Sequence, residues 1–233
     1  MIIVGHRGVA GEYPENTRAS IFAAIDLGLE WVEVDIQPTR DHQLVVCHDH
    51  TIDRCSSGRG RIDEMTLEAL KQHDFGSWFS TRFADERILC LNELLAIAKQ
   101  HNIKLNLEIK VDRHDPHEVC QLLAQALEQA NYPKQQLVLS SFNPEVMREL
   151  FTYLPDYSRA VLCERVSQRV IALLAEVEAS HCNVNYRWVS KRKVDQLKRL
   201  GYQVWAYTVN NPRSLKHLAN LDGIFSDHPQ RFL

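Results

Sequence analysis

The sequence predicts an α/β protein in which alternating strands and helices form a closed barrel, and three observations lead to this prediction. The chain has 233 residues, a length that barrel domains of this class reach as a single unit. Short apolar runs typical of strands alternate along it with longer stretches of helical periodicity, as expected for parallel strands joined by helices. Eight such β/α units fit into this length, which favours a closed (β/α)₈ barrel.

The expected units follow one another from the amino terminus. Residues 2–5 are the first strand, and the stripe of Ile21, Phe22 and Ile25 predicts the first helix at residues 17–27. The later expected strands are residues 31–36, continued beyond a turn by 44–48, then 104–109, 136–140, 159–163, 182–185, 202–209 and 223–225. The later expected helices are residues 91–100, 118–130, 145–153, 168–178, 191–200 and 213–221.

One segment interrupts this alternation. Residues 49–87 show no sustained periodicity, and the run Ser56-Ser57-Gly58-Arg59-Gly60 is turn-like. A plain loop of this length is uncommon in a compact domain. We therefore expect a small insertion on one side of a single barrel domain that spans residues 1–233.

Composition limits the classes of partner and compartment. The formal net charge is −3, so no basic surface indicates binding to nucleic acid. No apolar stretch approaches a membrane span, so stable membrane insertion is not expected. The six cysteines are scattered without a C-x-x-C pair, which suits reduced, structural residues. With no signal peptide visible, we expect a cytoplasmic protein, either monomer or homodimer.

Two of the expected strands carry charged side chains on one face. With the period of two of a strand, Glu33 and Asp35 share one face of the second strand, and Asn106 and Glu108 share a face with Lys110 in the next. Strands of a parallel barrel are buried on both faces, so these charged faces should point into the barrel. Alternation alone leaves a second interpretation open, in which both strands are half-exposed edges with polar faces in water.

Three carboxylates on one inner surface require compensation. Glu33, Asp35 and Glu108 would repel one another, and burying them unpaired would be very unfavourable. A hard divalent cation bound through oxygen would resolve both problems. Mg²⁺ and Ca²⁺ are the candidates, with Mn²⁺ as a further one.

Two histidines lie where barrel enzymes place their chemistry. His6 follows the first strand and His48 ends the run at residues 44–47, so both are expected at carboxyl ends of strands. Arg7, next to His6, has the planar guanidinium group that forks onto phosphate. The other histidines are expected to be solvated polar residues: His42, His50, His73, His101, His114, His117, His181, His217 and His228.

A set of short motifs occurs along nearly the whole chain in a specific order. The motifs are His6-Arg7-Gly8, Pro14-Glu15-Asn16-Thr17, Glu33-x-Asp35, His48-Asp49, Asp53-Arg54, Gly76-Ser77-Trp78-Phe79, Glu108-x-Lys110, Ser141-Phe142, Thr208-Val209-Asn210 and Asp222-Gly223-Ile224-x-x-Asp227-x-Pro229. In residues and order they resemble the glycerophosphodiester phosphodiesterase family, in its bacterial cytosolic type.

The resemblance implies a fold and roles for the site residues. It implies a (β/α)₈ TIM barrel with a small insertion after the second strand. It implies metal ligands at Glu33, Asp35 and Glu108 and acid/base roles for His6 and His48. It also implies that Arg7 and Lys110 lie near the phosphate.

The implied activity is metal-dependent hydrolysis of small-molecule glycerophosphodiesters to glycerol 3-phosphate and an alcohol. An alternative is phospholipase D-like action on lysophospholipids in the same barrel. Two non-enzymatic hypotheses are a non-catalytic barrel that binds metal or phosphate and a structural interaction module.

One departure from the family pattern concerns the alcohol side of the substrate. Tyr207 stands where Trp is usual, and Trp205 lies two residues earlier on the same face. A phenol stacks over less area than an indole and adds a hydroxyl group. Tyr207 is therefore either a substrate contact or a plain aromatic residue of the barrel wall.

Overall fold

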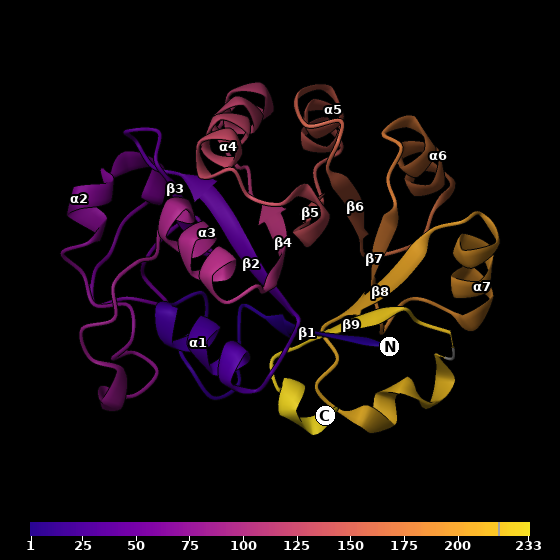
Figure 1. Ribbon diagram of the computed structural model, residues 1–233, viewed down its shortest axis with the longest axis horizontal. Helices are drawn as coiled ribbons and strands as arrows, with labels where there is room; N and C mark the ends of the chain where they lie inside the picture. The colour runs from indigo at the N-terminus through magenta and orange to yellow at the C-terminus, as the bar shows by residue number, and fades with distance from the viewer. Residues whose placement is uncertain (219) are drawn as a thin grey trace.

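The strands form one closed barrel in the computed structural model of the chain, which describes residues 1–218 and 220–233 (Figure 1). Around the barrel the order is β1-β9-β8-β7-β6-β5-β4-β2, and parallel pairing of β1 with β2 closes it. The predicted barrel of eight parallel strands is thus confirmed for the described residues. The strands are β1 (Ile2–His6), β2 (Trp31–Pro38), β3 (Leu44–Val46), β4 (Lys104–Ile109), β5 (Leu137–Ser141), β6 (Ser158–Cys163), β7 (His181–Asn185), β8 (Gln203–Tyr207) and β9 (Gly223–Ser226).

Helices surround the strands, as Figure 1 shows. Side-chain caps explain where several begin: Thr17, Asn143 and Ser167 each accept a hydrogen bond from a backbone N–H of the first turn. The α-helices are α1 (Arg18–Asp26), α2 (Leu67–Leu70), α3 (Leu91–Gln100), α4 (Pro116–Ala130), α5 (Pro144–Tyr153), α6 (Gln168–Glu176) and α7 (Lys191–Arg199). Short 3₁₀ helices are η1 (Ile62–Glu64), η2 (Thr81–Phe83), η3 (Lys134–Gln136), η4 (Pro212–His217) and η5 (Pro229–Arg231).

The prediction of a last helix at residues 213–221 is wrong. The connection from β8 to β9 contains the short 3₁₀ helix η4 instead, and residue 219 of the predicted helix lies outside the described residues. The start of this connection is held at the barrel, because the Val209 N–H donates to the Phe225 carbonyl at 2.8 Å and the Asn210 side chain donates to Asp227 at 2.6 Å. Little chain is then left for an α-helix.

Residues 44–48 do not continue the second strand. Leu44–Val46 form β3, which pairs antiparallel with the end of β2, with Val46 opposite Ile36. The chain therefore reverses after β2 and returns toward the barrel. The Cys47 N–H donates to the Asp35 carbonyl at 3.0 Å, which brings the next residue beside the carboxyl end of β2.

Residues 49–87 gather beside α1 and β3, at the left of Figure 1. They contain α2, η1 and η2 and share an apolar cluster with β3. That cluster is separate from the core between the barrel and its helices. Its buried members are Val45, Cys47, Ile52, Ile62, Leu70, Phe75 and Ile88.

The barrel interior is apolar at the amino-terminal ends of the strands. There the rings of Trp31 and Trp205 meet edge to face, with centroids 5.1 Å apart, and Trp205 also packs on Phe225. Trp205 is 1% exposed, so it belongs to this core and not to a surface that a substrate could reach. The polar residues of the barrel interior lie next to this apolar layer, toward the carboxyl ends of the strands.

The charged face of the second strand does point into the barrel. Every residue of β2 is buried, and the strand pairs with β1 on one side and β4 on the other. This excludes the alternative in which the strand is a half-exposed edge.

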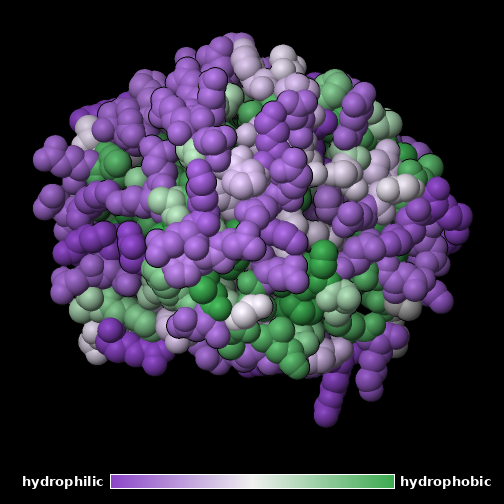
Figure 2. Space-filling model, viewed as in Figure 1, coloured by the Kyte–Doolittle hydropathy of each residue, from purple (hydrophilic) through white to green (hydrophobic). Residues whose placement is uncertain are grey.

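The face drawn in Figure 2 is mainly hydrophilic, with hydrophobic side chains gathered in its lower central part. Within the described chain, none of the helices combines the length and the apolar character that crossing a bilayer requires.

The prediction that His181 is a solvated residue is wrong. It is the first residue of β7, is 6% exposed, and lies edge to face against Trp205 at 4.9 Å between ring centroids. Its neighbour Ser180 is within 2.8 Å of its Nδ1 atom. Burial lowers the pKa of His181 to about 4, so the ring is neutral in the folded protein at neutral pH.

This buried imidazole predicts a specific loss of stability in acid. Between pH 6.5 and about 4 the unfolded chain binds a proton at His181 that the folded chain does not, so the free energy of unfolding falls as the pH is lowered through that window. The His181 contribution is on the order of 3 kcal/mol. We expect urea titrations of the wild type to show this extra loss relative to His181→Gln, which cannot titrate. Parallel stability profiles for the two proteins would contradict the prediction.

Candidate active site

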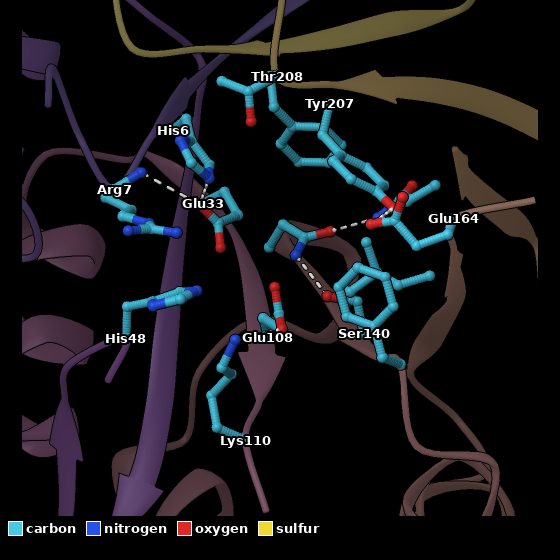
Figure 3. A pocket seen from close by; sticks show the side chains of 15 residues that line it. His6, Arg7, Glu33, His48, Glu108, Lys110, Ser140, Glu164, Tyr207 and Thr208 are labelled. Atoms are coloured by element: carbon cyan, nitrogen blue, oxygen red, sulfur yellow. Dashed lines mark hydrogen bonds and ion pairs between the residues drawn. The ribbon is translucent and has the colours of Figure 1, made fainter. Parts of the chain in front are cut away.

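A cavity of about 270 Å³ opens at the carboxyl ends of the barrel strands. All the sequence-predicted site residues except Asp35 line it (Figure 3). The Asp35 carboxylate lies 3.3 Å from Nε of Arg7, which is one of the lining residues. The lining residues are His6, Arg7, Glu33, His48, Asn106, Glu108, Lys110, Ser140, Phe142, Leu162, Glu164, Asn183, Tyr207, Thr208 and Phe225.

Strand register brings the three predicted carboxylates together. Asp35 of β2 lies opposite Glu108 of β4, and Glu33 lies opposite His6 of β1. One oxygen from each of Glu33, Asp35 and Glu108 lies within 4.8 Å of the other two. Glu33 and Asp35 are 4% and 1% exposed, so water screens their charges poorly.

The carboxylates have unlike affinities for protons. Burial and the neighbouring Asp35 raise the pKa of Glu33 to about 8, and the same two causes raise the pKa of Glu108. Burial also acts on Asp35, but the charges of Arg7 and Lys110 outweigh it and lower the pKa of Asp35 to about 2. The protein's own cations therefore compensate only part of the negative charge.

The donor set fits a hard divalent cation. All three candidate ligand groups are carboxylates, which Mg²⁺, Ca²⁺ and Mn²⁺ prefer. Oε1 of Glu33 is buried and has no hydrogen-bond partner among the described residues. A buried acceptor of this kind normally has a partner, so this atom fits a place in the coordination of an ion.

A strained turn completes this side of the cavity. Arg7 has φ of 52° and Gly8 has φ of 85°, both in the left-handed region that non-glycine residues rarely adopt. The turn directs the Arg7 N–H to Oε2 of Glu33 at 3.1 Å. A Cβ atom on Gly8 would collide with Ser20 of α1, so glycine is required by helix packing as well as by φ.

The Arg7 guanidinium group is partly engaged within the protein. Its Nη1 donates to Glu15 at 2.7 Å, and its Nε lies 3.3 Å from Asp35. Lys110 donates to Glu108 at 2.9 Å and lies 3.5 Å from Asp35. Both predicted cations thus face the carboxylate cluster and line the cavity.

Each predicted catalytic histidine is anchored by a carboxylate at Nδ1. His6 contacts Asp227 at 2.6 Å, and His48 contacts Asp49 at 2.7 Å. Hydrogen bonds from Arg54 lower the pKa of Asp49, and those from His6 and Asn210 lower the pKa of Asp227 against the effect of burial.

Both aspartates are therefore ionised acceptors. The Nδ1 atom of each histidine must be the donor, which leaves Nε2 of His6 and of His48 available for proton transfer in the neutral ring. His48 reaches this position two residues after the returning strand β3, and not, as predicted, at the carboxyl end of a barrel strand.

The two rings differ in proton affinity. For His6, burial opposes protonation, but the charges of Glu33 and Asp227 raise its pKa above the usual value. For His48, burial dominates and lowers the pKa. The Nε2 atom of His6 lies 3.8 Å from Glu33, next to the carboxylate cluster.

Asp49 belongs to a chain of ion pairs that reaches back to Arg7. Arg54 binds Asp49 through Nε at 2.7 Å and Glu15 through Nη1 at 2.7 Å, and Glu15 accepts from Arg7. His48 in the cavity wall is thus tied, through Asp49 and Arg54, to Glu15 of the β1–α1 loop.

The opposite wall contains Tyr207. Its hydroxyl donates to the Cys163 carbonyl at 3.0 Å, and its ring lies edge to face against Phe142 with centroids 5.7 Å apart. Tyr207 lines the cavity, whereas Trp205 lies below it in the core.

Sequence reasoning matched several other site residues to motifs but gave them no role. Asp49 adjoins His48 in the chain, so its contact is visible from a His-Asp pair. Asp227 lies 221 positions from His6, and only the pairing of β1 with β9 brings the two together. Asn16, which donates to Asp35 at 3.0 Å, likewise depends on the folded loop after β1.

Comparison with known proteins gives a consistent result. Residues 6–231 match the model of the glycerophosphoryl diester phosphodiesterase family. A glycerophosphodiester phosphodiesterase of Caldanaerobacter subterraneus is 30% identical over 100% of this chain and 96% of its own length.

Solved structures agree with this. An Oleispira antarctica phosphodiesterase, determined in complex with the product sn-glycerol-3-phosphate, is 30% identical with a TM-score of 0.95 and covers 99% of this chain and 94% of its own. The fold of a glycerophosphodiester phosphodiesterase from Agrobacterium tumefaciens is also shared, with a TM-score of 0.84 at 23% identity over 100% of this chain and 98% of its own.

The carboxylate cluster predicts that a divalent cation stabilises the fold. At 100 times its dissociation constant a ligand adds about 2.7 kcal/mol, which for a chain of this size raises Tm by about 5–10 °C. We expect Mg²⁺, Ca²⁺ or Mn²⁺ to give such a shift in differential scanning fluorimetry and EDTA to reverse it. Glu33→Gln should lose most of the shift, whereas the exposed Glu30→Gln should keep it. Equal shifts in both variants would contradict a site at Glu33.

Proposed function

Since the chain belongs to the glycerophosphoryl diester phosphodiesterase family and is an enzyme of that type, we propose that it hydrolyses glycerophosphodiesters to glycerol 3-phosphate and an alcohol. The observation that carries this proposal is the convergence, in one cavity, of three carboxylates and two histidines whose Nδ1 atoms are held by aspartates. The product bound by the similar Oleispira antarctica protein supports the choice of substrate class.

We propose a divalent metal as the cofactor, held by Glu33, Asp35 and Glu108, with Mg²⁺ or Ca²⁺ as first candidates and Mn²⁺ as a further one. When bound, such an ion supplies Lewis-acid stabilisation of charge on a non-bridging phosphoryl oxygen, an effect of several kcal/mol. Arg7 and Lys110 border the same part of the cavity and would add positive charge there.

His6 and His48 are assigned to proton transfer. One Nε2 atom takes the proton of the attacking hydroxyl, and the other gives a proton to the oxygen of the leaving alcohol. Asp227 and Asp49 keep each ring in the required tautomer and orientation. Positioned acid/base groups of this kind typically contribute about 10²–10⁴-fold each.

We propose that the glycerol 2-hydroxyl of the substrate attacks first. Its oxygen forms a bond to phosphorus, the bond to the head-group oxygen breaks, and a cyclic phosphate results. Water then opens the ring by the reverse proton transfers and yields glycerol 3-phosphate. Intramolecular attack can be worth about 7–11 kcal/mol through effective molarity.

The histidine assignment predicts the kinetic form of the defect. His6→Ala and His48→Ala should each lower kcat by about 10²–10⁴-fold with a much smaller change in KM, because the lost interaction operates in the transition state. The matched control is His117→Ala, at an exposed histidine of α4, which should leave both constants unchanged. Loss of binding with normal kcat in either site variant would overturn the assignment.

Attack by the substrate's own hydroxyl predicts a strict demand for that group. A 2-deoxy analogue of a glycerophosphodiester should bind but turn over very slowly, since the intramolecular nucleophile is missing. Assays of the released alcohol, or chromatographic separation of the phosphomonoester product, measure this directly, with the parent diester as control. Turnover of the analogue at the normal rate would rule out the cyclic intermediate.

A further inference from the structure

The cavity has two chemically unlike walls. Arg7 and Lys110 lie on the side of the carboxylate cluster and suit a phosphate group. Figure 3 shows Tyr207 and Glu164 on the other side, across the cavity from His48 and Lys110. The mechanism proposed above gives this second wall no role.

Glu164 places a carboxylate without a cationic partner at the cavity. It directly follows β6, and its Oε2 accepts from the Asn185 amide at 2.8 Å. Tyr207 Oη lies 3.5 Å from its other oxygen. Its neighbour Arg165 instead lies over the Trp188 ring, 4.5 Å from the centroid. Among the residues that the structure describes, no lysine or arginine forms an ion pair with Glu164.

Tyr207, which adjoins this carboxylate, is one of a packed pair of aromatic rings that line the cavity. Tyr207 is fixed by its hydrogen bond to the Cys163 carbonyl, and Phe142, which is 43% exposed, packs edge to face against it. Aromatic rings beside a carboxylate attract ammonium groups, because ring quadrupole and charge act in the same direction. A neutral polyol gains neither interaction to the same degree.

We infer that Glu164, Tyr207 and Phe142 form a subsite for the ammonium group of the leaving alcohol. The inference rests on the proposed function and specifies its substrate class as glycerophosphodiesters with a cationic head group, of the choline or ethanolamine kind. With the phosphate at Arg7 and Lys110, such a head group extends across the cavity to Glu164. Asn185 positions the carboxylate through its amide hydrogen bond.

The test compares three diesters that share glycerol and phosphate but differ in head group: glycerophosphocholine, glycerophosphoethanolamine and glycerophosphoglycerol. Glu164→Gln removes the charge but keeps an oxygen that can accept from Asn185. Because Glu164 is exposed, we expect the variant to lower kcat/KM up to about fivefold for the two cationic substrates, mainly through KM, and to leave glycerophosphoglycerol nearly unchanged.

The matched control is Glu178→Gln, which removes the same charge at the exposed turn between α6 and β7, at the other end of the barrel. It should leave all three substrates unchanged. Melting curves of both variants establish that they are folded.

The other outcomes overturn the inference. An equal loss for all three diesters in Glu164→Gln would place the glycerol or phosphate at this wall. No loss for any would show that the ammonium group binds elsewhere. In either case the wild-type turnover of glycerophosphoglycerol still supports the proposed function, whereas a wild type inactive on every diester would overturn both.

Discussion

Mutual repulsion among three buried carboxylates is the constraint on which the site depends. Glu33, Asp35 and Glu108 are held together inside the barrel by strand register, and water screens the buried charges of Glu33 and Asp35 poorly. No flexible loop carries these three groups, so they cannot relax apart without distorting β2 or β4. The resulting negative potential attracts whatever positive charge the site can hold, including Arg7, Lys110 and the proposed cation.

The rest of the barrel interior makes this arrangement tolerable. Below the carboxylates, the Trp31–Trp205 pair fills the barrel and fixes the strands at their amino-terminal ends. Around Asp35, Asn16 and Arg7 supply the hydrogen bond and the positive charge that keep it ionised. The polar site therefore lies next to an apolar layer of the barrel, and strands rather than loops position its three carboxylates.

The histidines show how segments distant in the chain come together at one cavity. His6 is oriented by Asp227, which directly follows the last strand, β9, so the orientation of a residue near the amino terminus depends on the carboxyl-terminal end of the chain. His48 is oriented by Asp49, which is in turn fixed by Arg54 and Glu15. Residues 49–87 thus contribute to the site through ion pairs, in addition to their own apolar cluster.

The barrel and most of the candidate site residues could be predicted from the sequence by itself, because both depend on patterns among neighbouring residues in the chain. Period-two alternation placed Glu33 and Asp35 on one face of β2, and Glu108 and Lys110 on one face of the next strand. The ordered motifs identified the family. These features depend on neighbours in the chain and are readable without knowing which strands meet.

Only the tertiary structure decided what depends on contacts between distant residues. The antiparallel return of β3 could not be distinguished from a continued strand, since an apolar run of three residues does not record its direction. The burial of His181 depends on the position of Trp205, and the partnership of His6 with Asp227 depends on the pairing of β1 with β9. Likewise, nothing in the sequence distinguishes Glu164 from an ordinary polar residue after a strand. Only the fold places it beside Tyr207 at the cavity. Such features are set by through-space distances, which a linear pattern does not contain.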